Sequence, residues 1–432
     1  MKVLVIGSGG REHAICHKLM ESESVSAVYC EPGSDAISEV ATCEGIDPLD
    51  FVSLVSLVKR EGIELTIVGP EAPLVAGIVD FFQENDLLIF GPTQKAAQIE
   101  GSKRFAKDLM KQYNIPTAAY ETFTSIQDAK EYIASTKGPY VIKANGLAAG
   151  KGVVIADGEQ EACQAVESML SGSKFGEAGR EIVIEAFLEG EEFSLMAFVN
   201  GTTVIPLEIA QDHKRVGEGD TGLNTGGMGA YSPVPQIPKS VVTQAVETIM
   251  KPVAEAMVKE GRSFTGILYG GLMLTKEGPK VIEFNARFGD PETQVVLPRL
   301  ESDLGVVLKN ILGGGHVELS WTKKTVVGIV LASLGYPEQY ETGTAIEGLS
   351  EVKGDSYVFH SGTKKQNEEY VSSGGRVVVI GAKGEGVKEA REKALRSLST
   401  IQNLTNFHYR KDIGYRAIMF DDSSLFEYTQ TK

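Results

Sequence analysis

The chain has 432 residues, of which 42% are hydrophobic and 23% charged, which excludes a disordered or fibrous protein and allows about three domains. Asp and Glu outnumber Lys and Arg by 58 to 42, so the net charge of −16 disfavours nucleic acid or an anionic membrane as the main partner. No apolar run approaches the ~18 residues of a spanning helix and no signal-peptide core is present, so we expect a cytoplasmic protein. Because the cysteines and histidines form no zinc motif, any metal ion is expected to have oxygen ligands.

The first hundred residues alternate between apolar strands and helical patterns. Strands are predicted at Lys2–Ile6, Leu65–Val68 and Leu87–Phe90, each followed by glycine. One helix is predicted over Arg11–Met20, and a second is predicted to begin at Asp47, with Asp47 as its cap and a proline in its first turn. This alternation predicts a parallel sheet with helices on both faces, where ligands gather at the carboxyl ends of the strands.

The middle of the chain changes character. Ser102 is expected to cap a helix that ends before Pro116, and short strands at Tyr140–Lys143 and Gly152–Ala156 flank a loop of small residues. A helix over Glu159–Leu170 and a strand over Glu181–Phe187 complete a block of the size of a lid. Strands then dominate up to about residue 300.

After three consecutive glycines at 313–315, the α+β pattern begins again. Strands are predicted at Thr325–Ser333 and Arg376–Ile380, and an amphipathic helix over Gly386–Gln402. The sequence therefore predicts a multidomain α/β and α+β chain with domains at 1–101, 102–321 and 322–432, the second carrying a lid at about 121–187.

The first glycine-rich turn, Gly7–Glu12, follows a strand and opens a helix. Free backbone N–H groups at such a turn favour a phosphate, and Arg11 adds positive charge. Glu12 stands where the dinucleotide fingerprint needs glycine, so a lone phosphate is favoured over a pyrophosphate. A tight strand–helix turn with a solvated arginine is the alternative.

The second glycine-rich loop, Lys143–Gly152, carries two lysines between two strands. Its spacing differs from that of a P-loop, because three residues separate Gly146 from Gly150 and Gly152 follows Lys151. A hairpin of this kind can fold over phosphates as a flap, with Lys143 as a fixed cation. A flexible surface hairpin is the alternative.

The segment Ile282–Glu292 contains the strongest candidate site. On a strand, Glu283 and Asn285 point to one face, where two oxygen donors can hold a cation such as Mg²⁺. Arg287 continues that face and can stabilise the oxygens of a transferring phosphoryl group. A strand with one solvent face is the alternative.

A charged run, Gln211–Arg215, precedes another glycine-rich loop at 222–229. Three potentially cationic side chains follow one another there in an acidic protein. The run is equally consistent with an anion-binding segment and with a solvated surface.

Taken together, these segments resemble the phosphoribosylamine–glycine ligases, or glycinamide ribonucleotide synthetases, a family of the ATP-grasp superfamily. The resemblance runs essentially from end to end, and its most specific part is the RFGDPETQ stretch from Arg287. It is carried by VLVIGSGGREHA from Val3, TIVGPEAPL from Thr66, IKANGLAAGKGV from Ile142, QDHKRVGEGDTGLNTGGMGAYSP from Gln211, VIEFNARFGDPE from Val281 and RKDIGYRA from Arg410.

The resemblance implies a biotin-carboxylase-like N-terminal domain, an ATP-grasp core with a small lid, and a small C-terminal α+β domain. It implies a ligase that joins glycine to 5-phosphoribosylamine, with ATP and Mg²⁺ or Mn²⁺, through a glycyl phosphate in purine biosynthesis. The sequence does not reveal the oligomeric state, and a monomer is our expectation. Arg287 and Lys143 are the implied catalytic residues, and Glu283 and Asn285 the metal ligands. The implied nucleotide-binding residues are Lys103, Lys143, Gly150, Lys151, Gly152, Glu185, Ala186, Phe187, Leu188 and Glu191. The implied substrate-binding residues are Gly9, Gly10, Arg11, Asp212, Lys214, Arg287, Gly289, Asp290 and Glu292.

The sequence departs from the family pattern in three places. Asn145 stands where Asp is common, Leu223 stands where Pro is common, and the strand Gly266–Thr275 lacks the acidic metal ligand of many ATP-grasp enzymes. Two alternatives stay open: another ATP-grasp ligase or carboxylase, and a nucleotide-binding regulatory protein without turnover.

Overall fold

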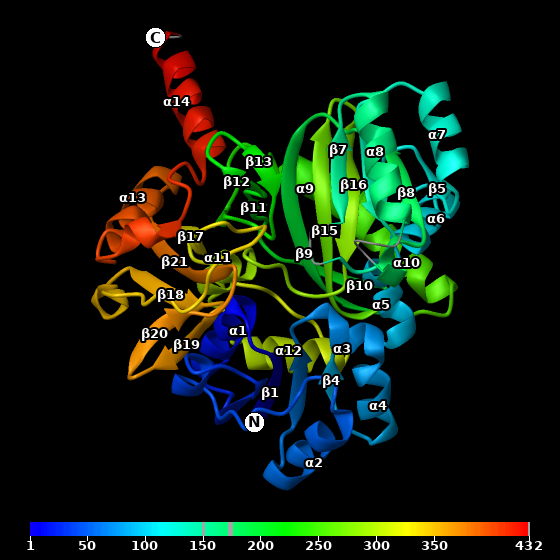
Figure 1. Cartoon of the computed structure of the whole chain (residues 1–432). Coiled ribbons are helices and arrows are strands. Elements are labelled where there is room, and N and C mark those ends of the chain that lie inside the picture. The colour runs from blue at the N-terminus through cyan, green and yellow to red at the C-terminus, as the bar shows by residue number, and fades with distance from the viewer. Residues whose placement is uncertain (149–151, 172–175, 431–432) are drawn as a thin grey trace.

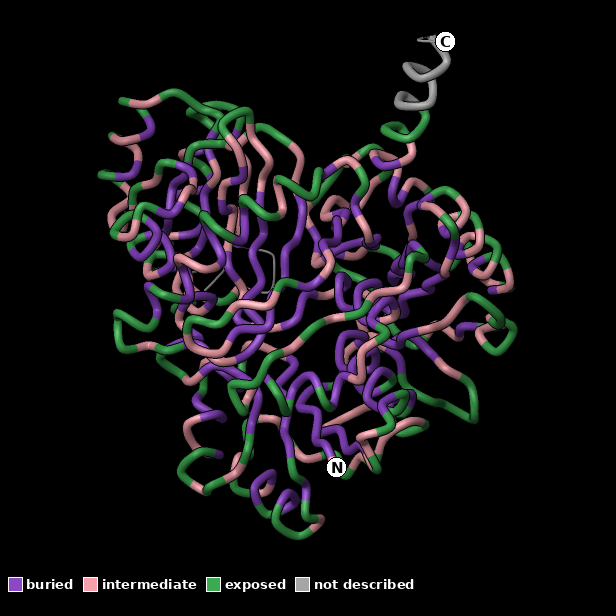
Figure 2. The backbone as a smooth tube through the Cα atoms, turned by 180° about the vertical axis from the view of Figure 1, so that it is seen from behind, coloured by how far each residue is buried: buried purple, intermediate pink, exposed green. Residues whose placement is uncertain are grey.

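The computed structural model describes residues 1–148, 152–171 and 176–430, and for 423–430 it describes the backbone alone. The N-terminal part, the ATP-grasp core with its lid sheet and the C-terminal part meet around a common centre, and helix α14 (Tyr415–Gln430) projects from the body (Figure 1). Buried backbone concentrates in the strands where these parts meet (Figure 2). No described helix is long and apolar enough to cross a membrane.

The N-terminal part is a parallel sheet in the order β2-β1-β3-β4, as the alternating pattern predicts. The continuous apolar runs form its strands because helices cover both faces. Its elements are β1 (Lys2–Gly7), α1 (Gly10–Met20), β2 (Ala27–Pro32), α2 (Phe51–Glu61), β3 (Leu65–Val68), α3 (Glu71–Ala76), α4 (Ile78–Glu84), β4 (Ile89–Phe90) and α5 (Gln94–Gly101).

The predicted start of the second helix is wrong by three residues. Helix α2 begins at Phe51, because the Asp50 carboxylate accepts the N–H of Ser53 at 3.1 Å and caps it. Asp47 instead accepts the N–H of Leu49 at 2.8 Å and forms a turn before the helix.

The lid sheet has the order β5-β8-β6-β7 and lies beside α7 and α8 (Figure 1). Helix α6 (Lys103–Gln112) leads into it, and Ser102 caps this helix as predicted by accepting the N–H of Phe105 at 3.1 Å. The remaining elements are β5 (Tyr120–Phe123), α7 (Ile126–Ser135), β6 (Tyr140–Ala144), β7 (Val153–Ala156), α8 (Glu159–Leu170) and β8 (Ile182–Ala186).

The central sheet is antiparallel, in the order β10-β9-β15-β16, and carries the Glu283 strand at one edge. That strand ends at Asn285, so the face shared by Glu283 and Asn285 does not continue to Arg287, which lies in the loop after the strand. The elements are β9 (Glu191–Asn200), β10 (Thr203–Pro206), α9 (Lys239–Ala245), α10 (Lys251–Lys259), β15 (Thr265–Thr275), β16 (Gly278–Asn285), α11 (Thr293–Val296) and α12 (Leu304–Leu312).

The C-terminal sheet has the order β11-β14-β17-β21-β18, with β22 also paired to β17. Ala230 of β14 pairs with Gly328 of β17, so this sheet crosses the boundary predicted at residue 322. The elements are β11 (Gln211–Asp212), the hairpin β12 (Arg215–Gly217) and β13 (Thr221–Asn224), β14 (Gly229–Ser232), β17 (Thr325–Ser333), β18 (Ser356–His360), the hairpin β19 (Thr363–Gln366) and β20 (Glu369–Ser372), β21 (Arg376–Gly384), α13 (Val387–Leu398) and β22 (Phe407–His408).

Candidate active site

A cavity of about 800 Å³ lies where the three parts meet. Most of the predicted site residues line it, although they come from distant stretches of the chain. They are Arg11, Lys103, Lys143, Gly152, Glu185, Ala186, Phe187, Leu188, Asp212, Lys214, Glu283, Asn285, Arg287, Gly289, Asp290 and Glu292. Gly9, Gly10 and Glu191 do not line it, and Gly150 and Lys151 of the predicted flap lie outside the described residues.

Three buried charges form one wall of the cavity. Glu185 on β8 pairs with Lys143 on β6 at 2.8 Å and with Lys107 on α6 at 2.7 Å, and each side chain is at most 4% exposed. The ammonium of Lys143 also donates to the carbonyl of Ile282 at 2.9 Å. Burial lowers the pKa of Lys107 to about 8, against the opposing effect of Glu185. One carboxylate thus orients two cations at the predicted phosphate end.

Lys103 supplies a third cation to this wall, and its pKa is lowered by burial. Its ammonium donates to the carbonyl of Gly146 at 3.0 Å, which ties α6 to the start of the glycine-rich loop. Asn145, which stands where the family commonly has Asp, also links the loop to α6, because its Oδ1 accepts the N–H of Arg104 at 2.8 Å. Its amide also donates to Glu181 at 2.9 Å.

The predicted metal ligands lie side by side on the cavity wall. Glu283 and Asn285 make no hydrogen bond or ion pair with any other described side chain, so their oxygens are available to a ligand. Burial alone would raise the pKa of Glu283, but Lys214 and Lys143 help to hold it below its usual value. An ionised carboxylate beside an amide oxygen suits a hard divalent cation. No cluster of three or more Asp, Glu, His or Cys side chains suited to a metal is found among the described residues.

Arg287 is held by carboxylates on two sides. Its Nε donates to Glu71 at 3.1 Å and its Nη2 pairs with Glu100 at 3.0 Å, while Nη1 donates to the carbonyl of Phe288 at 3.1 Å. Glu100 also accepts the N–H of Ala286 at 2.7 Å. The guanidinium is therefore fixed in place at the cavity edge.

The cavity lining also includes an aspartate with an unpaired carboxyl oxygen. Asp212 Oδ1 has no hydrogen-bond partner among the described residues, and burial raises its pKa well above the usual value, with a further rise from Glu292. Its neighbour Lys214 forms an ion pair with Glu192. Asp212 thus keeps one buried oxygen without a hydrogen-bond partner among the described residues.

The charged run at 211–215 contains fewer cations than the sequence suggests. His213 is buried against Tyr231, and its Nε2 accepts the N–H of Gly414 at 3.1 Å. Burial, followed by the nearby charge of Arg410, lowers the pKa of His213 to about 4. It is therefore neutral at pH 7 and adds no positive charge to the run.

The segment after Arg287 is fixed by partners that sequence reasoning missed. Glu292 accepts a hydrogen bond from Tyr269 at 2.7 Å and one from Ser194 at 3.0 Å. Asp290 pairs with Arg376 at 3.2 Å, and although burial opposes it, this arginine lowers the pKa of Asp290. Tyr269 and Arg376 both line the cavity, but each comes from a strand with no recognisable motif.

In the first glycine-rich turn, the side chain of Glu12 folds back onto the turn's own backbone. Glu12 accepts the N–H of Gly9 at 2.8 Å and pairs with Arg11, whose Nη1 donates to the carbonyl of Phe288 at 3.3 Å. A Cβ at Gly69 would lie 2.1 Å from the same carboxylate, so glycine is required there. Of this turn, only Arg11 reaches the cavity.

Three domain models of a single protein family match most of the chain. The N, ATP-grasp (A) and C domains of phosphoribosylglycinamide synthetase match residues 1–100, 101–293 and 326–416. The chain is also 56% identical to the phosphoribosylamine–glycine ligase of Halalkalibacterium halodurans, over 97% of each protein. The chain belongs to the phosphoribosylamine–glycine ligase family. It is therefore an ATP-dependent ligase that forms glycinamide ribonucleotide in purine biosynthesis, and it uses ATP with a divalent metal ion.

Solved structures agree with this family and confirm the predicted fold class. The phosphoribosylamine–glycine ligase of Thermotoga maritima superposes with a TM-score of 0.83 at 32% identity, over 96% of this chain and 100% of that one. A biotin carboxylase from Campylobacter jejuni has a TM-score of 0.71 at 13% identity, over 94% and 91% of the two chains, and shows the fold alone. The family match and the curated relative set aside both alternatives, another ATP-grasp ligase or carboxylase and a regulatory protein without turnover.

Proposed function

We propose that the ligase works through glycyl phosphate, formed and consumed in the one cavity. A glycine carboxylate oxygen attacks the γ-phosphorus of ATP, and ADP leaves with the electrons of the broken P–O bond. The nitrogen of 5-phosphoribosylamine then attacks the acyl carbon, phosphate leaves, and the nitrogen loses one proton. This order is favoured because a free carboxylate is a poor acceptor for an amine, whereas its phosphate anhydride has a good leaving group.

The buried lysines are proposed to hold the ATP phosphates. Lys103 and Lys143 lie on one wall of the cavity with their ammonium groups already oriented by Gly146 and Glu185. Fixed cations in a buried site stabilise charge on a transferring group without reorganisation during the reaction. The segment Glu185–Leu188 and the glycine-rich loop that contains Gly150, Lys151 and Gly152 are proposed to border the nucleotide.

The free oxygens of Glu283 and Asn285 are proposed to hold the divalent ion, with Mg²⁺ as the expected ion and Mn²⁺ as a substitute. Such an ion neutralises charge on phosphate oxygens. Arg287, fixed by Glu71 and Glu100, is proposed to donate to the oxygens of the phosphoryl group as it moves.

The wall that carries Asp212 is proposed to bind the two amines. Asp212 Oδ1 is an unpaired acceptor, and Glu292 is oriented by Tyr269 and Ser194, so both can accept hydrogen bonds from an amino group. Gly289, Asp290 and Lys214 complete this wall.

The ribose phosphate is proposed to lie near Arg11 and the turn with Gly9 and Gly10. One observation supports the whole proposal. The cations Lys103, Lys143 and Arg287, which come from three separate segments, line the same cavity as Glu283 and Asn285, in a member of this family. A cytoplasmic, monomeric enzyme is proposed from the sequence and the family resemblance.

An isotope experiment tests the order of steps. Glycine labelled with ¹⁸O in its carboxylate is incubated with Mg-ATP and 5-phosphoribosylamine generated in situ, and the products are analysed by mass spectrometry. An acyl phosphate transfers one labelled oxygen to the released phosphate. Glycinamide ribonucleotide formed with unlabelled phosphate would refute the glycyl phosphate.

The metal assignment has its own test. Glu283→Gln should abolish ligation and weaken Mn²⁺ binding measured by electron paramagnetic resonance, with the melting temperature retained. Glu277→Gln is the matched control, because Glu277 lies in the exposed turn before the same strand. Equal Mn²⁺ binding by both variants would remove Glu283 from the metal site.

A further inference from the structure

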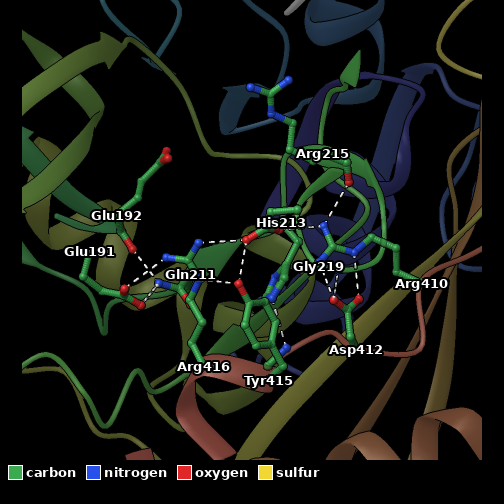
Figure 3. Close-up of polar contacts among 12 residues, drawn as sticks. Glu191, Glu192, Gln211, His213, Arg215, Gly219, Arg410, Asp412, Tyr415 and Arg416 are labelled. Atoms are coloured by element: carbon green, nitrogen blue, oxygen red, sulfur yellow. Dashed lines mark hydrogen bonds and ion pairs between the residues drawn. The ribbon is translucent and has the colours of Figure 1, made fainter. Parts of the chain in front are cut away.

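The C-terminal segment Arg410–Arg416 holds the β12–β13 hairpin through its side chains (Figure 3). Asp220, in the turn of that hairpin, accepts hydrogen bonds from Arg410 at 2.8 Å, from Tyr415 at 2.9 Å and from Arg416 at 2.8 Å. Its backbone is in the left-handed region, with φ of 57°. Burial would raise the pKa of Asp220, but the three donors lower it to about 2, so it is ionised at pH 7.

The two arginines of the segment differ in what they can do. Arg410 is fully buried, and its donors are taken up by Asp412, Asp220 and the carbonyl of Arg215, as expected for a structural residue. The side chain of Arg416 is 34% exposed, and it lines the cavity. Its Nη1 donates to Glu191 at 3.0 Å and its Nη2 to Asp220 at 2.8 Å.

These two acceptors belong to different segments that border the cavity lining. Glu191 begins β9 directly after the lining segment 185–190, on the proposed nucleotide side. Asp220 belongs to the hairpin that brings Arg215 and Asn224 to the cavity lining. The amide of Gln211 donates to Oε1 of Glu191 at 2.8 Å, which leaves Oε2 to Arg416.

We infer that Arg416 is a positioning residue for ligation, which joins the start of β9 at Glu191 to the hairpin at Asp220. Arg410 and Tyr415 still hold Asp220 when Arg416 is replaced, but the direct link between the hairpin and the start of β9 is lost. The affinity for ATP therefore falls although no proposed phosphate ligand is removed. The inference rests on the proposed placement of the nucleotide beside residues 185–191.

Kinetics and direct binding test this role. Arg416→Gln should raise the KM for ATP and the Kd for ADP by about tenfold, as expected for losing charge-assisted hydrogen bonds, with a much smaller change in kcat. Arg416→Lys, which can reach only one of the two carboxylates, should give an intermediate Kd. Lys388→Ala is the matched control, since it removes an exposed cation on α13 and should leave both constants unchanged.

A double-variant cycle separates bridging from independent effects. Asp220→Asn alone should raise the Kd for ADP, and it also weakens the contacts of Arg410 and Tyr415. In that background Arg416→Gln should raise the Kd far less than it does in the wild type. Additive effects would overturn the inference, as would an unchanged Kd for ADP or a loss of melting temperature and kcat together. ADP binding by calorimetry needs no turnover, so an unchanged Kd beside normal ligation refutes the bridge and leaves the proposed function standing.

Discussion

Replacing Lys107 by Met should change how the stability of the protein depends on alkaline pH. Lys107 is buried beside Glu185, and its pKa is about 8 in the folded chain against 10.5 for an ordinary lysine. Between those two values the unfolded chain binds one more proton at this residue than the folded chain does. The free energy of unfolding therefore rises with pH in this range, and below pH 8 the contribution of Lys107 no longer changes with pH.

The size of the effect follows from the shift. Each pH unit contributes about 1.4 kcal/mol, so the rise over the whole range is about 3 kcal/mol for one buried lysine. Lys107→Met removes this contribution, and the stability curves of variant and wild type should diverge steadily from pH 8 to 10.5.

Urea denaturation followed by circular dichroism at half-unit intervals of pH measures this difference. Subtracting the two curves cancels the other groups that titrate in the same range. Lys111→Met, which removes an exposed lysine one turn further along α6, is the control and should follow the wild type. Parallel curves for the wild type and Lys107→Met above pH 8 would refute the reasoning.

Two further substitutions test the geometry of the site. Gly190→Ala should destabilise the protein by about 2 kcal/mol in urea denaturation, because a Cβ there would lie 2.0 Å from the backbone carbonyl oxygen of Leu274. Gly158→Ala is the control, because a Cβ there meets no atom within 4 Å, and it should destabilise the protein far less. Equal losses of stability in the two variants would contradict the argument. Tyr269→Phe should lower kcat/KM for glycine about tenfold, since it removes a hydrogen bond to the charged Glu292, with the KM for ATP unchanged in steady-state assays. An ATP effect as large as the glycine effect would place Glu292 away from the amine.

The elements and the main motifs were predictable because each leaves a local pattern. Strand β1, helix α8 and the Ser102 cap follow from apolar periodicity and capping chemistry, which depend on neighbouring residues. The resemblance then assembled the segments into one site. Which of Asp47 and Asp50 caps α2 could not be predicted, because both precede the same apolar pattern and the surrounding contacts decide between them.

The missed residues act through contacts between distant segments. Arg376 reaches Asp290 from a strand 86 positions away, and nothing in its own neighbourhood indicates this. Lys107 did leave a signal, since it lies four residues after Lys103 and so on the same face of α6. The pairing of Arg287 with Glu71 and Glu100 likewise depends on the way the N-terminal part packs against the core.

The ladder between β14 and β17 gives the chain a natural point for dividing it into two reassembling pieces. A cut in the connection after α12 would leave β14 at the edge of one fragment and β17 at the edge of the other. Exposed strand edges carry unpaired N–H and C=O groups, which can pair with a complementary strand. Two fragments expressed together would thus reassociate through the β14–β17 pairing. Growth of a purine-requiring host would show that the reassembled enzyme is active.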